Sequence, residues 1–219
     1  HDCPRHSSLR IKFMHAIIFD IGNVLVEYDH TQTLAAVAAS FGVTTADLNI
    51  AYHKVGKQFG LGQLQPAQVC NFLNRQFGAS LALEQFATTF CAGLTRNDAA
   101  LAYVDTLQVD GELFVGAISN TNATHVAWLD AHVPELNNFE LVVMSNEVAL
   151  LKPDPEIFEL ALELLDLPAR HVLYIDDSTE NVVAAQSLGM ESFVHTDWAT
   201  THPRIEAWCN AWRAVPTAA

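Results

Sequence analysis

A set of carboxylate, hydroxyl, amide and ammonium groups follows four short apolar runs of this sequence, at the points where the runs stop. In chain order these residues are Asp20, Ser119, Asn120, Lys152, Asp176 and Asp177. A carboxylate can act as a covalent nucleophile and divide one difficult hydrolysis into two easier steps. A fixed cation and hydrogen-bond donors can stabilise the charge of a phosphoryl group during transfer. The residue types therefore predict phosphoryl transfer to Asp20, with Ser119 and Lys152 as catalytic partners and the amide of Asn120 as a substrate contact.

A carboxylate such as Asp20 repels a phosphate dianion, so a nucleophile of this kind needs a cation nearby. Mg²⁺ keeps several waters in proteins and usually takes only one or two carboxylates, which Asp20 and Asp177 can supply. Asp176 is expected to support this metal site from behind, with an exchange of the two roles left open. Without a cation, the neighbouring carboxylates would repel one another. The sequence thus predicts Mg²⁺ as the cofactor.

The apolar runs that precede these residues are typical of buried strands in a parallel sheet, which is covered by helices on both faces. They cover residues 14–19, 113–118, 141–144 and 172–175, and residues 192–194 suggest a fifth strand. Helical patterns lie between them, for example over 155–165 and 179–188. This alternation predicts an α/β fold with a doubly wound, Rossmann-like parallel sheet. Ligands bind at the carboxyl ends of the strands in such sheets.

The segment between the first and second strands has helical periodicity and contains no convincing strand. Its candidate helices cover residues 31–40, 46–52, 66–77 and 84–94. We therefore expect a small all-helical cap over residues 31–107, inserted into a core formed by 13–30 and 108–219. Since such a cap covers one end of the sheet, His53 is a candidate contact to the substrate beyond its phosphate.

At these strand ends the sequence resembles the haloacid dehalogenase superfamily, most of whose members are phosphatases. The first motif reads D-x-G-N-V from Asp20 and the second reads S-N-T-N from Ser119, as in the branch that includes glucose-1-phosphate phosphatase. The resemblance covers the chain from about residue 13 and includes the position of the helical cap. It implies an aspartyl-phosphate intermediate on Asp20, the carbonyl of Gly22 as a third metal ligand, and Asn181 as a further support of the metal region. Asn23 of the first motif is a candidate substrate contact.

One position departs from the pattern of that superfamily. Most of its phosphatases carry a second Asp two residues after the nucleophile, where this chain has Gly22. General acid–base help is typically worth about 10²–10⁴-fold in rate, and a glycine cannot move a proton. Another residue could replace it, the leaving group could need little help, or the chain could bind phosphate without turnover. The candidate replacements are Glu27, Asp29, His53 and His125.

The function expected from these residues is Mg²⁺-dependent hydrolysis of a small phosphorylated metabolite, with a sugar phosphate as the family-level expectation. A 2-haloacid dehalogenase is the first alternative because that activity also lacks the second Asp. It needs no metal, however, and gains nothing from the pair Asp176 and Asp177. The second alternative is a catalytically silent protein that binds a phosphate ligand.

Composition argues against a nucleic-acid partner and a membrane partner. The 219 residues carry 25 acidic and 11 basic side chains, a net charge of −14, which disfavours a nucleic-acid partner. No apolar run reaches the roughly 18–20 residues that span a bilayer, so no membrane partner is expected. The four cysteines form no CxxC pair, and residues 1–12 make a poor secretory signal. We therefore expect a cytoplasmic protein, with monomer and homodimer both open.

Overall fold

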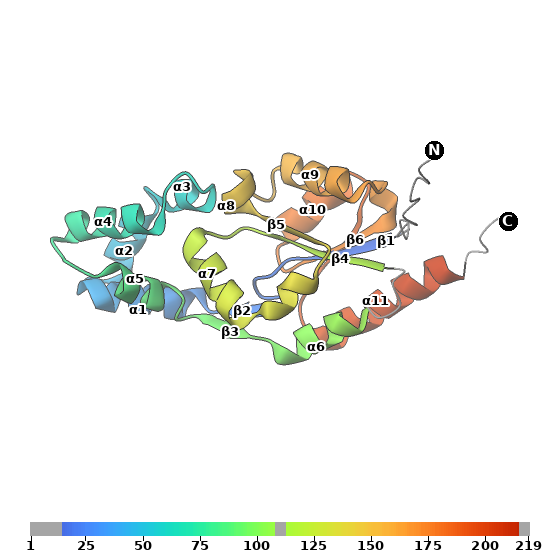
Figure 1. Ribbon diagram of the computed structural model, residues 1–219, viewed down its shortest axis with the longest axis horizontal. Coiled ribbons are helices and arrows are strands. Elements are labelled where there is room, and N and C mark those ends of the chain that lie inside the picture. Colours follow the sequence, from blue (N-terminus) through green and yellow to red (C-terminus); the bar gives the residue numbers. More distant parts are fainter. Residues whose placement is uncertain (1–14, 108–112, 215–219) are drawn as a thin grey trace, which may run out of the picture.

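The computed structural model describes residues 15–107 and 113–214. Five parallel strands form one sheet in the order β5-β4-β1-β6-β7, with β1 at its centre (Figure 1). Their bounds are β1 His15–Phe19, β4 Leu113–Ser119, β5 Leu141–Met144, β6 Val172–Asp176 and β7 Glu191–Val194. All five predicted strands are thus confirmed to within one residue over the described part of the chain. Residues 13, 14, 108–112 and 215–219 of the predicted core lie outside it, as do residues 1–12.

Alternate side chains of β1 point to opposite faces of the sheet, and helices cover both of these faces. Ile17 and Phe19 pack in one hydrophobic cluster with Leu101, Leu129 and Ile205. These three residues come from α6 Asp98–Leu107, α7 Ala123–His132 and α11 Trp198–Arg213. Every side chain of the central strand after His15 is therefore withdrawn from water, which is why the run is continuously apolar and does not alternate.

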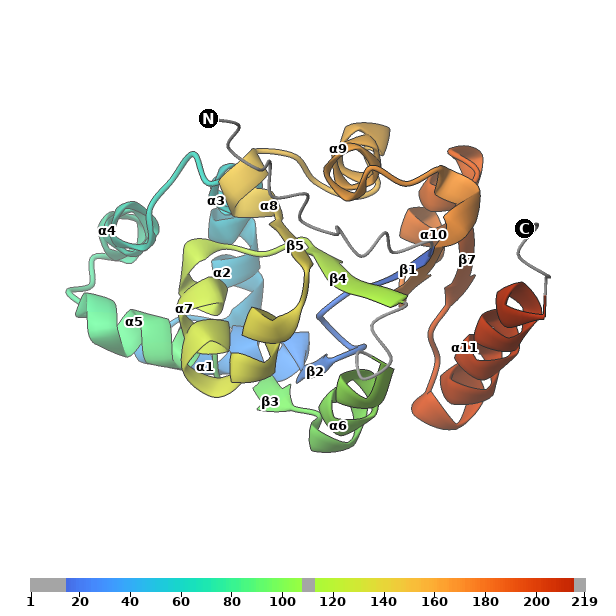
Figure 2. The ribbon, with the colours of Figure 1, turned by 45° about the vertical axis from the view of Figure 1, so that its right-hand side comes forward.

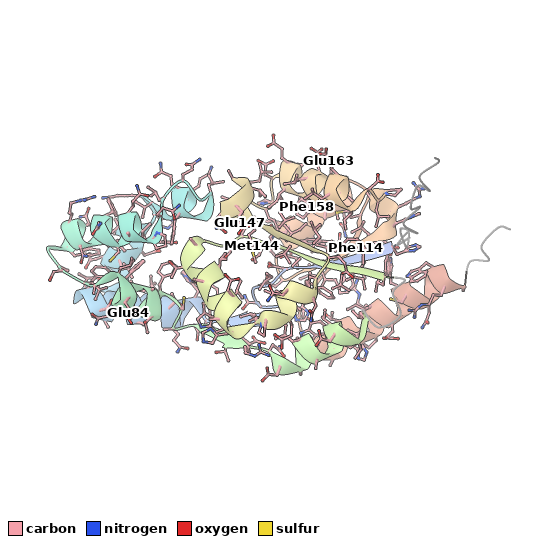
Figure 3. All side chains as sticks on the ribbon, viewed as in Figure 1. Glu84, Phe114, Met144, Glu147, Phe158 and Glu163 are labelled. Atoms are coloured by element: carbon pink, nitrogen blue, oxygen red, sulfur yellow. The ribbon has the colours of Figure 1, made fainter. Side chains whose placement is uncertain are left out.

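The second face of the sheet is covered by α9 Pro155–Leu165 and α10 Thr179–Ser187. Ile18 packs there in a cluster with Phe158 and Ala185. Figure 2 shows these helices on one side of the sheet and α6 and α11 on the other. In Figure 3, Phe158 lies between α9 and the sheet, whereas Glu163 on the same helix points outward. The doubly wound, Rossmann-like architecture predicted from the sequence is confirmed.

The cap lies beside the carboxyl edge of the sheet (Figure 1). It contains five helices. They are α1 His30–Phe41, α2 Thr45–Tyr52, α3 Gly56–Gly60, α4 Pro66–Phe77 and α5 Leu83–Phe90. Asp29 begins α1 by accepting a hydrogen bond from the N–H of Gln32, and Gly42 ends it in the left-handed conformation. The helices bury a hydrophobic cluster of their own that runs from Val37 to Phe90.

Two expectations for the inserted segment were wrong. The helix predicted over 84–94 ends at Phe90, and β3 Leu94–Arg96 follows it and pairs antiparallel with β2 Val26–Tyr28. Three-residue strands are too short for a period-2 pattern to reveal them. In addition, α6 lies within the predicted cap but packs through Leu101 and Val104 on the core cluster. We therefore draw the boundary of the cap at β3 and not at residue 107.

The cap contacts the core through the end of α3. The hydroxyl of Ser145 donates to the carbonyl oxygen of Gly60 at 2.8 Å. Gly62 has φ of +69°, and a Cβ atom there would lie 1.9 Å from the carbonyl oxygen of Asn146. Ser145 and Asn146 begin α8 Ser145–Val148, which directly follows β5. The cap is thus fixed to the end of a core strand by close backbone packing.

The remaining described elements are two 3-10 helices, η1 Pro134–Asn138 and η2 Ala169–His171. In the described residues, no single helix is long and apolar enough to cross a membrane. The bent pair α1 and α2 passes that test together, at 98° to one another.

Candidate active site

Asp20 follows the central strand and is held between the ends of its neighbours. Its amide N–H donates to the carbonyl oxygen of Ile175 at 2.7 Å, and its Oδ1 accepts from the N–H of Ile21 at 2.7 Å. Burial raises the pKa of Asp20 to about 6, against the opposing charge of Lys152. Further positive charge beside this carboxylate would favour its ionised, nucleophilic form.

Lys152 is buried and bridges the carboxylates of two strand ends. Its Nζ lies 2.8 Å from Asp20 Oδ1 and 2.8 Å from Asp176 Oδ2, and it donates to the carbonyl oxygen of Ile118 at 2.8 Å. An ammonium group has three donors, so all three are used. In this arrangement Lys152 contributes a fixed positive charge to the site and has no further N–H group to donate to a ligand.

The Asn120 side chain fixes the backbone of Lys152. Its Nδ2 donates to the carbonyl oxygen of Lys152 at 2.8 Å, and its Oδ1 accepts from the N–H of Lys152 at 2.8 Å. The amide side chain therefore positions the lysine, which the sequence did not predict. The expected substrate contact was the backbone amide of Asn120, and that expectation stays a prediction.

Asp176 is fully buried, and hydrogen bonds surround both of its oxygens. Oδ1 accepts from the N–H of Ser178 at 2.8 Å, Nδ2 of Asn181 lies 3.0 Å from each oxygen, and the hydroxyl of Tyr174 donates to Oδ2. Burial opposes ionisation, but Lys152 and these donors keep the pKa of Asp176 lowered. The carboxylate has little remaining capacity for a metal, which agrees with the supporting role expected of Asp176 and Asn181. The sequence reasoning missed Tyr174, although it precedes Asp176 by two residues and so lies on the same face of β6.

Asp177 is exposed and accepts from Nδ2 of Asn23 at 2.8 Å. Asn23 has φ of 55°, a left-handed conformation that asparagine tolerates. Its Oδ1 accepts from the N–H of Tyr28 at 3.0 Å, so the side chain links the turn after β1 to Asp177. The structure gives the Asn23 side chain a positioning contact to Asp177, and its expected contact with the substrate stays a prediction.

Three carboxylates meet at this point of the sheet. Ligand oxygens of Asp20, Asp176 and Asp177 lie within 4.8 Å of one another, and Lys152 is the cation held between two of them. The donor set is made of hard oxygens, the kind that Mg²⁺ prefers. These residues therefore fit a divalent cation, with Asp177 the least committed of the three carboxylates.

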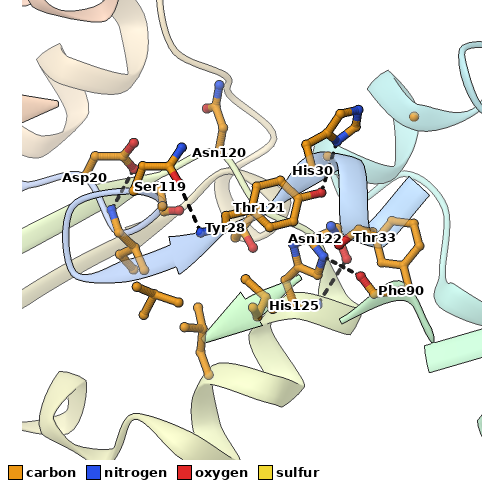
Figure 4. Close-up of a pocket in the computed structure, with 18 of the residues that line it drawn as sticks. Asp20, Tyr28, His30, Thr33, Phe90, Ser119, Asn120, Thr121, Asn122 and His125 are labelled. Atoms are coloured by element: carbon orange, nitrogen blue, oxygen red, sulfur yellow. Dashed lines mark hydrogen bonds between the residues drawn. The ribbon is translucent and has the colours of Figure 1, made fainter. Parts of the chain in front are cut away.

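A cavity of about 360 Å³ opens beside this cluster and continues toward the cap. At its polar end it is lined by Asp20, Gly22, Asn23, Ser119, Asn120, Lys152, Asp177 and Asn181. Figure 4 shows Ser119 next to Asp20, as expected from the adjacent, parallel strands β4 and β1. Except for Asp176, which lies behind it, the structure thus brings the residues predicted from the four strand ends to one cavity wall.

Three of the candidates for proton transfer are not among the described residues that line this cavity. Glu27 accepts from Nδ2 of Asn97 at 2.8 Å, and Asp29 caps α1. His53 is exposed at the end of α2, so it is not brought to the predicted substrate site; its neighbour Tyr52 lines the cavity instead.

His125 does line the cavity, but at the end away from Asp20 (Figure 4). Its Nε2 lies 3.2 Å from the carbonyl oxygen of Phe90, and burial lowers its pKa to about 4. The ring is therefore neutral at pH 7, and Nε2 is the protonated nitrogen because a carbonyl can only accept. It is not placed to donate a proton at Asp20. The structure thus supplies no replacement for the acid missing at Gly22 from these four residues.

Comparison with models of known protein families identifies the family of this chain. The model of a hydrolase family, haloacid dehalogenase-like hydrolase, matches residues 14–189. The chain therefore belongs to this family, and the resemblance seen in its motifs is confirmed.

Several relatives of known function are phosphatases. The chain is 29% identical over 189 residues to sesquiterpene phosphatase astK of Aspergillus oryzae, covering 85% of this chain and 92% of that protein. It is 26% identical over 189 residues to D-ribitol-5-phosphate phosphatase of Bacteroides thetaiotaomicron, covering 81% and 89%. It spans only 33% of the length of drimenol cyclase drtB of Aspergillus calidoustus, at 27% identity over 185 residues. The expected class, a hydrolase that acts on phosphate esters, is confirmed at this level.

Solved structures share the fold. The crystal structure of a HAD family enzyme from Bacteroides thetaiotaomicron superposes with a TM-score of 0.77 at 22% identity, covering 87% of this chain and 99% of that one. A second crystal structure of that enzyme contains magnesium and inorganic phosphate, and it superposes with a TM-score of 0.70 at 22% identity, covering 86% and 98%. The Rossmann-like core with a helical insertion is thus a known fold of this family.

Proposed function

We propose that this protein is a Mg²⁺-dependent phosphatase that hydrolyses a small phosphorylated metabolite through an aspartyl-phosphate on Asp20. The observation that carries the proposal is the buried ion pair of Asp20 with Lys152, set within 4.8 Å of two more carboxylates at the mouth of a cavity. Such a cluster repels a phosphate unless a cation joins it. The phosphatases and the magnesium–phosphate complex among its relatives support the same function.

In this proposal, Oδ2 of Asp20 is the nucleophile. The two contacts described for the carboxylate, with Lys152 and with the N–H of Ile21, are both made by Oδ1, so they hold the group in place and leave Oδ2 toward the cavity. A bond forms between Oδ2 and phosphorus while the bond to the alcohol oxygen breaks. Water then attacks phosphorus, which releases phosphate and restores Asp20.

The other residues of the site bind and orient the phosphate group and neutralise its charge. Lys152 offsets the charge that gathers at Asp20 and the phosphate, and the hydroxyl of Ser119 and the amide of Asn120 donate to phosphate oxygens. Asp20, Asp177 and the carbonyl of Gly22 would hold Mg²⁺, which supplies charge neutralisation and orients the phosphate. Asp176 and Asn181 position Lys152 and the loop that carries Asp177.

The first alternative, a 2-haloacid dehalogenase, gains support from Gly22 alone. Dehalogenation does not account for the cluster of three carboxylates formed by Asp20, Asp176 and Asp177. A silent phosphate binder, the second alternative, has no need of a buried carboxylate aligned by Lys152, because an uncharged donor would bind an anion at lower cost. Phosphate hydrolysis accounts for more of the site than either.

The experiment is phosphate release from a panel of phosphate monoesters, with Mg²⁺ and with a chelator, by the wild type, Asp20→Asn and Asp130→Asn. Asp130 is exposed on α7 and serves as the matched control. We expect release that needs Mg²⁺, is lost in Asp20→Asn and is unchanged in Asp130→Asn. Equal activity of the wild type and Asp20→Asn, or chelator-resistant halide release from a 2-haloacid, would overturn the proposal.

A further inference from the structure

The cavity at Asp20 has a second end with a different character, formed by the cap together with Leu129 of α7. Beyond the phosphate-binding residues its wall consists largely of aliphatic and aromatic side chains. We define the cap chamber by six of them: Leu34, Val37, Leu48, Leu73, Phe90 and Leu129. Val37, Leu48, Leu73 and Phe90 also belong to the buried hydrophobic cluster of the cap. The core of the cap therefore opens directly onto the cavity.

Three of the polar side chains that line the cavity near the cap chamber, those of Thr33, Asn122 and His125, bond to the protein backbone. The hydroxyl of Thr33 accepts from the N–H of Gly93 at 3.1 Å. The amide oxygen of Asn122 accepts from two backbone N–H groups at the start of α7, at 3.0 and 3.1 Å. His125 is paired with the carbonyl of Phe90. A polyol placed here would find these bonded atoms occupied, and each hydroxyl buried without a partner weakens binding.

Charge divides the cavity in the same way. The carboxylates and the ammonium group in the described lining are Asp20, Lys152 and Asp177, all at the phosphate end. His125, at the other end, is neutral at pH 7 because burial lowers its pKa to about 4. The cap chamber thus favours a group that carries no charge and few hydroxyls. The whole cavity, with its phosphate end included, has a volume of about 360 Å³, which lies in the usual range for a small-molecule site.

We infer that the substrate is the phosphate monoester of a predominantly apolar alcohol, whose hydrocarbon part fills the cap chamber while its phosphate lies at Asp20. This inference rests on the proposed function and narrows it, and it departs from the sugar phosphate expected from the sequence. Burial of the hydrocarbon part supplies binding free energy in proportion to the apolar area removed from water. The products are the free alcohol, which takes its proton from water, and inorganic phosphate.

The first test compares kcat/KM for three phosphate esters in the presence of Mg²⁺. They are a branched aliphatic alcohol phosphate, a polyol phosphate with the same number of non-hydrogen atoms, and p-nitrophenyl phosphate as an activated reference. We expect the aliphatic ester to exceed the polyol ester by about tenfold or more, the scale on which hydrophobic pockets discriminate. Equal or better turnover of the polyol ester would overturn the inference and leave the proposed function intact.

The second test changes the wall of the cap chamber. Leu34 lines it and is only partly buried, so Leu34→Gln adds a polar group without removing a core side chain. Leu64→Gln is the matched control, since Leu64 packs on the same cluster but is not among the described residues that line the cavity. We expect Leu34→Gln to lower the aliphatic-to-polyol ratio of kcat/KM about tenfold, and Leu64→Gln to leave it unchanged.

The outcomes of these tests distinguish the inference about the cap chamber from the proposed phosphatase function. An unchanged ratio in Leu34→Gln, or an equal loss in both variants, would overturn the inference about the cap chamber. Absence of phosphate release from all three esters by the folded, Mg²⁺-loaded wild type would overturn the proposed function, and the inference with it.

Discussion

The phosphate end of the cavity and the cap chamber are built in different ways. At the phosphate end, residues far apart in the chain are joined by short polar contacts, such as those of Lys152 with Asp20 and Asp176. In the cap chamber, side chains such as Leu73 and Phe90 are held by packing within one small hydrophobic cluster. A single lost hydrogen bond matters at the first end because its partner is left buried and charged, whereas the second end can change shape and polarity by single substitutions.

Apart from removal of the nucleophile Asp20 itself, we expect the largest single loss of activity from a substitution of Lys152. Lys152→Met would leave Asp20 and Asp176 facing one another without their shared cation. We expect kcat to fall about 10²–10³-fold, the scale of a lost electrostatic group, and the free energy of unfolding to fall by about 3–5 kcal/mol. Phosphate-release kinetics and urea denaturation measure the two effects. Wild-type kcat in a folded Lys152→Met protein would refute the role given to this residue.

A gain is predicted at the position of the missing acid. A Cβ atom on Gly22 would meet nothing within 4 Å, and its φ is not in the left-handed region. Gly22→Asp is therefore sterically tolerated and adds a carboxyl group at the phosphate end. For esters with a poor leaving group we expect kcat to rise by about 10²-fold, the lower end of general-acid effects, with little change for p-nitrophenyl phosphate. An equal change for both kinds of ester would show that the added carboxyl does not act on the leaving group.

A smaller effect is predicted for the residue that orients Asp177. Asn23→Gly removes the hydrogen bond to Asp177 but tolerates the positive φ of that position. We expect the Mg²⁺ concentration for half-maximal activity to rise about tenfold, as for other residues that orient metal ligands, while kcat at saturating Mg²⁺ changes little. Asn71→Ala, on the exposed side of α4, is the control. A loss of kcat that Mg²⁺ does not restore would assign Asn23 to the substrate.

The smallest effect is predicted at the cap end, and it concerns stability. Burial lowers the pKa of His125 to about 4 from 6.5. The pKa of His125 is lower in the folded state than in the unfolded state, so the neutral ring contributes to the free energy of unfolding. This contribution is fully present above pH 6.5 and is lost as the pH falls toward about 4, by roughly 3 kcal/mol at most.

Urea denaturation at pH 7 and pH 5, in a chelator, would measure this loss in the wild type and in His125→Gln. The variant should lose less stability between the two pH values. His15 and His195 also have lowered pKa values, so the difference between the two proteins is the relevant quantity. An identical loss in both would show that His125 is not held neutral.

The sequence predicted the phosphate end better than the cap chamber for a physical reason. A parallel sheet brings the ends of its strands to one edge, so Asp20, Ser119 and Asp177 could be placed together from their order in the chain. The contacts of Asn23 depend on a left-handed turn that the sequence does not reveal. The partners of Lys152 depend on the path of its loop across the edge of the sheet.

In the cap, a difference of one residue decides which side chain reaches the cavity. Successive residues of a helix point about 100° apart, so Tyr52 lines the cavity while His53 faces solvent. The order and the ends of four cap helices could be predicted within a few residues, whereas the short helix α3 Gly56–Gly60 was missed. The rotation of the helices about their own axes could not be predicted. The apolar character of the cap chamber was hidden for the same reason, since its leucines are typical of any packed helix.

The central claim is that Asp20 carries the phosphoryl group during turnover. The most direct test is acid quenching of the Mg²⁺-loaded enzyme within the first turnover of a substrate, followed by mass spectrometry of its peptides. We predict a phosphoryl group on the peptide that contains Asp20, at the aspartate itself, and none in Asp20→Asn. Rapid phosphate release by the wild type without any phosphoryl group on Asp20 at any quench time would contradict the claim.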